Sequence, residues 1–223
     1  PDGQLTGLRT EFGEHGHGAA GSVPSNIVLV GIAPFSYTYE TTPANERLGW
    51  IANHEMVHIV MGDNASAQDR AFRKVFRRVF PSPDDPISMF YSYLSSPRHY
   101  SPRWYHEGIA AFMETWMAGG VGRALGGYDE MAFRAMVRDE RNIYDMVGLE
   151  AEGTAIDFQV GANAYLYGTR FLNYLTRTYG PEKFLQFVSR EEGSKGYFAA
   201  QFRKVYGVPI HEEWRKWIAA EQA

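Results

Sequence analysis

The sequence predicts an α+β fold that is mainly α-helical, in which a small N-terminal β-sheet is followed by a helical body. The continuous apolar segment 26–35 (NIVLVGIAPF) is typical of a buried strand, and segment 36–40 (SYTYE) is expected to pair with it. Beyond residue 42, apolar residues recur at helical spacing between Gly and Pro breaks. The 223 residues, 44% hydrophobic and 22% charged, fit one globular domain spanning 1–223.

The first expected helix spans 43–61. Thr42 is a suitable N-cap, Pro43 suits the first helical position, and Gly62 is expected to end the helix. Its apolar residues lie on most sides, so we expect it to be central and buried. The same signals predict further helices at 66–80, 86–95, 102–117, 129–139, 160–179, 181–190, 195–206 and 209–222, whereas the Gly-rich residues 1–25 are expected to be loop.

The expected helix 66–80 is amphipathic, with apolar residues at i, i+3, i+4, i+7 and i+8. Its other face carries the basic residues Arg70, Arg73, Lys74, Arg77 and Arg78. We expect this face to be solvated, and contact with an acidic partner or an anionic membrane surface is the alternative. The Gly-rich segment 119–129 is expected to shape the edge of a cleft. Arg103 and Arg123 are predicted as surface residues, with contact to a substrate carboxylate as the alternative.

Composition excludes several classes of protein. The chain has no cysteine, which excludes disulfides, thiolate metal sites and a Cys nucleophile. Its net charge of −4 argues against nucleic acid as the main partner. No apolar run is long enough for a transmembrane segment. Because the chain begins at Pro1, we expect it to be a fragment of a longer protein that carries an additional domain.

The helix 43–61 contains His54-Glu55-Met56-Val57-His58, an H-E-x-x-H motif. Residues at i and i+4 share one helix face, so both imidazoles can reach one ion, and two neutral His side chains suit Zn²⁺. Glu55 would then project beside the metal, as the base for its bound water. The alternative is two core histidines beside an unrelated Glu. A buried helix carrying these polar groups is costly unless they are satisfied, which favours the metal site.

A catalytic zinc site needs a third protein ligand. The expected helix 102–117 offers three candidates, His106, Glu107 and Glu114, and its Gly108 and alanines allow another helix to approach closely. Neighbouring residues point about 100° apart on a helix, so His106 and Glu107 are not expected to be ligands together.

The motifs HEMVH (54–58) and PRWYHEGIAAFME (102–114), followed by AYLYGTRFLNYLTRTYGPEKFLQF (164–187), resemble the gluzincin zinc metallopeptidases, especially the peptidase MA-like group. This resemblance covers about residues 26–190 and implies a gluzincin-like fold. It assigns Glu107 as the third zinc ligand. It also implies that Tyr165 or Tyr167 stabilises the transition state, with Tyr165 preferred because it precedes Gly168 by three residues.

The resemblance has departures. The family often carries an acidic residue one turn after the ligand Glu, where this chain has Ala111. Glu114 is then a candidate partner for a zinc-binding His, with a surface position as the alternative. Met61 and Asn64 replace the Gly and His of the metzincin pattern, which excludes a three-His site. By analogy with the family, the strand at 27–35 is expected to lie near an edge that holds substrate.

The resulting prediction is zinc-dependent hydrolysis of a peptide or protein substrate. Water bound to Zn²⁺ would attack the scissile carbonyl, with Glu55 as general base. The alternative is a catalytically weak zinc-binding scaffold or interaction module, and the presence of Glu55 favours the enzyme. The resemblance also favours a periplasmic or secreted location.

Overall fold

The computed structural model describes residues 7–11, 19–22, 27–31, 47–77, 82, 84–120, 122–150 and 163–223. Side chains are described from residue 52 onward, except at 128, 129 and 150. The helices in chain order are α1 (Arg47–Asp63), α2 (Ala67–Phe76), α3 (Pro86–Ser95), α4 (Arg103–Met117), α5 (Gly127–Arg138), α6 (Met146–Glu150), α7 (Asn163–Tyr179), α8 (Pro181–Val188), α9 (Phe198–Tyr206) and α10 (Ile210–Glu221), with two short 3-10 turns at Pro97–Tyr100 and Arg123–Leu125. All but α6 coincide with predicted helices.

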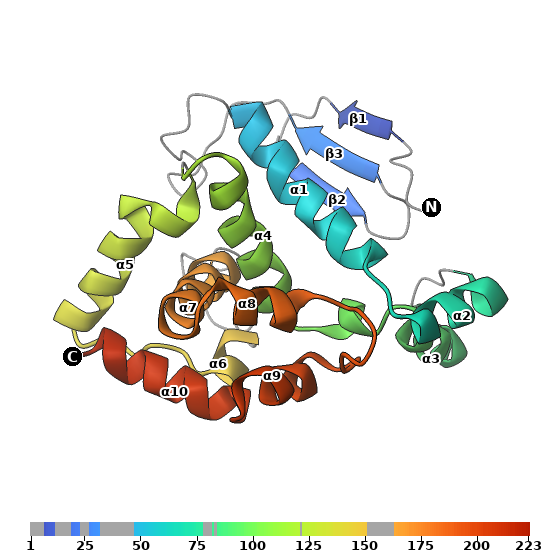
Figure 1. The fold of residues 1–223 in the computed structure, drawn as a ribbon. Helices are drawn as coiled ribbons and strands as arrows, with labels where there is room; N and C mark the ends of the chain where they lie inside the picture. The colour runs from blue at the N-terminus through green and yellow to red at the C-terminus, as the bar shows by residue number, and fades with distance from the viewer. Residues whose placement is uncertain are drawn as a thin grey trace.

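Helix α4 lies at the centre of the domain, between α1 and α7 (Figure 1). The closest approach of α4 and α7 is at Gly108 and Gly168. A Cβ atom added to Gly108 would lie 2.6 Å from the Gly168 backbone, and one added to Gly168 would collide with the Trp104 carbonyl oxygen. Only glycine permits this separation of the two helices, and the crossing fixes the height of Glu107 and Tyr165 on their helices.

Aromatic side chains build the core around this crossing. Trp104 of α4 is fully buried, with its ring centroid 5.1 Å from that of Trp214 and 5.8 Å from that of Phe171. Trp217 lies 4.9 Å from Trp214 between ring centroids. These separations suit the tilted and edge-to-face contacts that aromatic rings prefer. The packing joins α4 and α7 to α10 and makes a rigid base for the side chains above it.

Helix α1 ends one residue beyond Gly62, at Asp63, so the predicted stop at Gly62 is wrong. The reason is a cap supplied by Arg73 of α2. Its Nη2 donates to the Gly62 carbonyl at 2.9 Å and its Nη1 to the Asp63 carbonyl at 3.2 Å, and its Nε donates to the Ser95 carbonyl at 2.8 Å. A cation at these terminal carbonyls also suits the helix dipole. Arg73 is therefore half-buried and structural, although the basic face was expected to be solvated.

Helix α2 begins at a capping box, in which the Ser66 side chain accepts from the Asp69 backbone N–H and the Asp69 side chain accepts from that of Ser66. It ends at Phe76, before the predicted end at residue 80, and residues 78–80 lie outside the described part. On its basic face Lys74 and Arg77 are exposed, as predicted.

The predicted α+β fold class needs correction. Among the residues whose side chains the structure describes, 75% are helical and none belongs to a strand, so the domain that carries the site is helical. The three strands are described by their backbone alone: β1 (Gly7–Glu11), β2 (Ala19–Ser22) and β3 (Ile27–Gly31). Strands of four or five residues bury little apolar area, whereas the aromatic core described above lies entirely on helices.

The arrangement of these strands also differs from the expectation. β3 lies within the predicted strand 26–35, but it pairs with β1 in parallel and with β2 in antiparallel orientation. Both partners come from residues 1–25, which the sequence indicated as loop, and residues 36–40 lie outside the described part. Because β3 is the middle strand, both of its edges are paired, and the expected substrate-holding edge cannot be β3 itself. Among the described residues no helix is long and apolar enough to cross a membrane.

Candidate metal centre

Two helices that are far apart in sequence bring three ligand atoms together. His54 and His58 lie one turn apart on α1, and Glu107 reaches them from α4. The His54 Nε2 and His58 Nε2 atoms are 3.2 Å apart. The Glu107 Oε2 atom lies 3.2 Å from His54 Nε2 and 3.3 Å from His58 Nε2. The three atoms therefore form a nearly equilateral triangle.

This triangle fits one zinc ion. For tetrahedral Zn²⁺ with bonds of about 2.0–2.1 Å, two ligand atoms are separated by about 3.3 Å. The separations above match this value, and the donor set of two imidazole nitrogens and one carboxylate oxygen is typical of catalytic zinc sites. Three protein ligands would leave one coordination position of such an ion open. Among the described residues these three form the group that could hold a metal ion.

The second ring nitrogen of His54 is held by Glu114. The His54 Nδ1 atom lies 2.7 Å from Glu114 Oε2, and Glu114 is fully buried. Arg123 in turn donates to both carboxylate oxygens, from Nε to Oε1 and from Nη2 to Oε2, each at 2.7 Å. The Nη2 atom also lies 2.8 Å from His54 Nδ1. If His54 Nε2 held a metal, the ring proton would sit on Nδ1, where Glu114 Oε2 would accept it.

The Gly-rich segment after α4 places Arg123. A Cβ atom at Gly122 would collide with Thr115, so the chain can turn back against α4 only with glycine there. The Ala124 backbone N–H then donates to the Thr115 hydroxyl at 3.0 Å. Arg123 is 6% exposed, so its prediction as a surface residue is wrong. The sequence signal that could have found it is an Arg preceded by glycine, nine residues after Glu114.

Electrostatics in this centre favour charged carboxylates. Burial would by itself raise the pKa of Glu107, but hydrogen bonds with His54 and His58 outweigh it and lower the pKa well below its ordinary value. Burial would likewise raise the pKa of Glu114, but the charge and hydrogen bonds of Arg123 lower it. The opposite balance holds at His54, where burial would lower the pKa but the two glutamates raise it. The two charged carboxylates therefore make positive charge favourable in this centre.

Glu55 and Tyr165 are the other predicted site residues near this triangle. Glu55 is buried, at 4% exposure, and follows the ligand His54 on α1. The Tyr165 ring lies 5.8 Å from that of His54 between centroids, and the guanidinium carbons of Arg123 and Arg103 lie 4.9 and 5.5 Å from its centroid. Burial raises the pKa of Tyr165, so its hydroxyl remains a proton donor at neutral pH.

The structure places Tyr167 elsewhere. Its side chain is 1% exposed, with its ring centroid 5.2 Å from that of Phe133, and its hydroxyl accepts from the Tyr144 backbone N–H at 3.2 Å. Two residues along a helix correspond to a rotation of about 200°, so Tyr165 and Tyr167 face opposite sides of α7. Tyr167 therefore belongs to the aromatic core.

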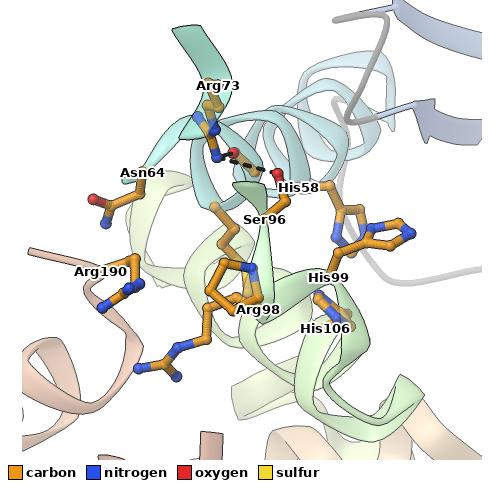
Figure 2. A pocket seen from close by; sticks show the side chains of 11 residues that line it. His58, Asn64, Arg73, Ser96, Arg98, His99, His106 and Arg190 are labelled. Atoms are coloured by element: carbon orange, nitrogen blue, oxygen red, sulfur yellow. Dashed lines mark hydrogen bonds between the residues drawn. The ribbon is translucent and has the colours of Figure 1, made fainter. Parts of the chain in front are cut away.

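The remaining ligand candidate, His106, faces a different space. Figure 2 shows its ring beside those of His58 and His99, in a pocket next to the metal centre. Burial, together with the nearby His58 and His99, lowers the pKa of His106 to about 4, so its imidazole is neutral at physiological pH. Among the described residues, the group that could hold a metal ion includes Glu107 but not His106.

Comparisons with known proteins assign no family to the chain. No family model, no curated protein and no solved structure matches it.

Proposed function

We propose that this protein hydrolyses peptide bonds with the help of one bound zinc ion. The observation that carries the proposal is the triangle of His54 Nε2, His58 Nε2 and Glu107 Oε2, with sides of 3.2 to 3.3 Å. A purely structural zinc site usually supplies four protein ligands, whereas this group supplies three. The open position and the adjacent Glu55 support a hydrolytic role.

A zinc ion held by these ligands supplies Lewis acidity, which acidifies water and polarises a carbonyl group. Glu55 acts as general base, taking a proton from the attacking water and passing it to the leaving amine. Its burial keeps it out of bulk water, which strengthens its interaction with the reacting groups.

Three further residues support this chemistry without taking up the proton. The Tyr165 hydroxyl donates a hydrogen bond to the carbonyl oxygen of the substrate as that oxygen becomes negatively charged. Glu114 accepts the Nδ1 proton of His54 and so keeps the ligand nitrogen unprotonated. Arg123 holds Glu114 in place with two hydrogen bonds.

The first experiment is the metal content of the purified protein by elemental analysis, for wild type and Glu107→Gln. We expect about one zinc per wild-type chain and a marked loss in Glu107→Gln, because a neutral amide is a poor zinc ligand. Glu191→Gln is the matched control, since Glu191 is exposed and far from α1 in sequence. Wild-type protein that takes up no zinc at micromolar concentration would sink the proposal.

The second experiment is a peptide-library cleavage assay read by mass spectrometry, with the zinc-loaded protein and Glu55→Gln. We expect cleavage by wild type only. Stoichiometric zinc without any cleavage would instead favour the zinc-binding scaffold.

A further inference from the structure

A second pocket lies beside the metal centre, on the other side of His58. Its volume is about 30 Å³. It is formed where the end of α1, the 3-10 turn at Pro97–Tyr100 and the segment after α8 meet. Figure 2 shows the rings of His58, His99 and His106 on one side and the guanidinium groups of Arg98 and Arg190 on the other. Arg73 of α2 and His106 of α4 also line it, so five separate segments of the chain form the pocket.

The lining of this pocket is strongly basic. It includes three arginines and three histidines: Arg73, Arg98, Arg190, His58, His99 and His106. Of the described residues that line it, none is Asp or Glu. The three arginines therefore give the residues of this lining a net positive charge.

Arg98 is the most informative of these residues. It is 6% exposed, and its Nη1 donates to the Tyr105 hydroxyl at 2.9 Å, while its Nη2 donates to the Lys195 carbonyl at 3.1 Å. These acceptors are neutral, and within the described part of the chain no carboxylate pairs with Arg98. Its buried Nε–H has no acceptor among the described residues. A buried guanidinium without a counter-charge is costly, so an anion beside it is strongly favoured.

Arg190 and His106 add two more groups of the same kind. Arg190 is 6% exposed and pairs with Asp69 at 2.7 Å through Nη2, but its buried Nε–H has no acceptor in the described part. The buried Nε2 atom of His106 is also without a described partner. Three residues that line the pocket therefore each carry a buried nitrogen atom without a hydrogen-bond partner among the described residues.

We propose that this pocket, the anion pocket, binds a carboxylate group through Arg98 and Arg190. A single water needs about 10–15 Å³ measured in the same way, so about 30 Å³ suits the two oxygens of a carboxylate better than the four of a phosphate. Arginine is the side chain that best matches a planar carboxylate.

The neighbouring metal centre indicates where such a carboxylate comes from. His58 lines the anion pocket and also contributes its Nε2 atom to the ligand triangle. Resting on the proposed peptidase function, the carboxylate belongs to the peptide substrate, as an Asp or Glu side chain or as the chain terminus. The protein then prefers acidic peptides.

Carboxylate binding is tested first without metal, so that its outcome does not depend on the peptidase activity. Acetate is titrated into EDTA-treated protein at constant ionic strength by calorimetry, with acetamide as the neutral isostere. We expect acetate to bind with a dissociation constant in the millimolar range, about −4 kcal/mol, and acetamide not to bind. Equal heats for acetate and acetamide would overturn the proposal.

The variant Asn64→Asp is designed to leave the fold intact. Asn64 lines the pocket but is exposed, and the new carboxylate would repel the ligand. We expect acetate affinity to fall about tenfold. Gln222→Glu adds the same charge at an exposed position near the C-terminus and should leave the affinity unchanged. Arg98→Gln should abolish binding, although it also removes fold contacts. Unchanged acetate affinity in Asn64→Asp contradicts the proposal even if Arg98→Gln does not fold.

The source of the carboxylate is tested with three further probes on wild type. N-acetylglutamate amide presents only a side-chain carboxylate, N-acetylglycine presents only a terminal one, and inorganic phosphate is the free-ion alternative. Tighter binding of either peptide-like probe than of acetate supports a substrate role, and tighter binding of phosphate contradicts the choice of carboxylate. In the zinc-loaded protein, cleavage of Glu-containing peptides should exceed that of their Gln counterparts, and Asn64→Asp should remove this difference.

Discussion

The metal centre and the anion pocket share His58 but carry opposite charge. The metal centre contains Glu55, Glu107 and Glu114 and one buried guanidinium, that of Arg123, which pairs with Glu114; the half-exposed Arg103 lies beside Glu107. Its carboxylates therefore exceed its buried cation, which suits a bound dication. The anion pocket is lined by Arg73, Arg98 and Arg190 and by no Asp or Glu among the described residues, although Arg190 pairs with Asp69 outside the lining.

The difference is that one end of α1 borders two groups of side chains with opposite net charge. Buried charges are costly unless they are paired, and an excess of one sign persists only where a ligand of the other sign compensates it. The excess of carboxylate on one side of His58 points to a cation, and the excess of guanidinium on the other side points to an anion. The predictions below perturb each side in turn.

The largest effect is expected from Glu55→Gln, which removes the general base but keeps the ligand triangle. Peptide cleavage should fall about 10²–10⁴-fold, whereas zinc content should stay near one per chain. Single-turnover kinetics on the zinc-loaded proteins measure the first quantity and elemental analysis the second. If Glu55→Gln cleaved peptides as fast as wild type, a residue other than Glu55 would be the general base.

The second-largest effect is expected from a change at the crossing of α4 and α7, where Gly108 and Gly168 are in contact. Gly168→Ala would force the helices apart, because the added methyl meets the Trp104 carbonyl oxygen. We expect a loss of about 3 kcal/mol in the free energy of unfolding, measured by urea denaturation, together with weaker zinc binding. Gly127→Ala is the matched control, since a Cβ atom there meets nothing within 4 Å, and it should change stability by less than about 1 kcal/mol.

Glu114→Gln leaves Arg123 buried without its carboxylate and weakens the hold on His54. We expect a loss of about 3 kcal/mol in stability and a 10–100-fold loss in zinc affinity, measured by denaturation and by competition with a chelator. The control Glu130→Gln breaks an exposed ion pair with Arg170, while Arg170 remains paired with Glu221. This variant should lose less than about 1 kcal/mol in the free energy of unfolding. Similar losses of stability in Glu114→Gln and Glu130→Gln would show that burial does not make the Glu114–Arg123 pair more important than the exposed pair.

The same variant has a defined pH dependence. Arg123 lowers the pKa of Glu114 in the folded protein from its ordinary 4.5, so the stabilisation is fully present above that value. It is lost as the pH falls through the lowered pKa, because the carboxylate must then be protonated. The stability difference between wild type and Glu114→Gln should therefore be constant above about pH 5 and shrink below pH 4. Urea denaturation at a series of pH values measures it.

The smallest effect is expected on the metal side from a change in the anion pocket. Asn64→Asp should leave the free energy of unfolding within about 0.5 kcal/mol of wild type and leave zinc content unchanged, because Asn64 is exposed. A large loss of zinc in this variant would show that the two regions are one site rather than two.

Local signals in the sequence predict most of the helices. The Ser101-Pro102 pair precedes α4, and the glycines at 119 and 120, both with positive φ, follow it as expected. The prediction fails at Gly62, where capping by Arg73 extends α1, and at residues 1–25, where β1 and β2 pair with β3. Both failures involve partners distant in sequence, which local propensity cannot see.

The sequence by itself determined that His54 and His58 lie together, because residues at i and i+4 share a helix face whatever surrounds them. The motif in α4 also indicated Glu107. Only the tertiary structure decided that Glu114 faces His54 and that Arg123 is buried against it. It alone assembled the anion pocket, whose Arg98 and Arg190 stand in separate segments. The physical reason is that helix periodicity fixes directions within one element, whereas distances between elements depend on how their side chains pack.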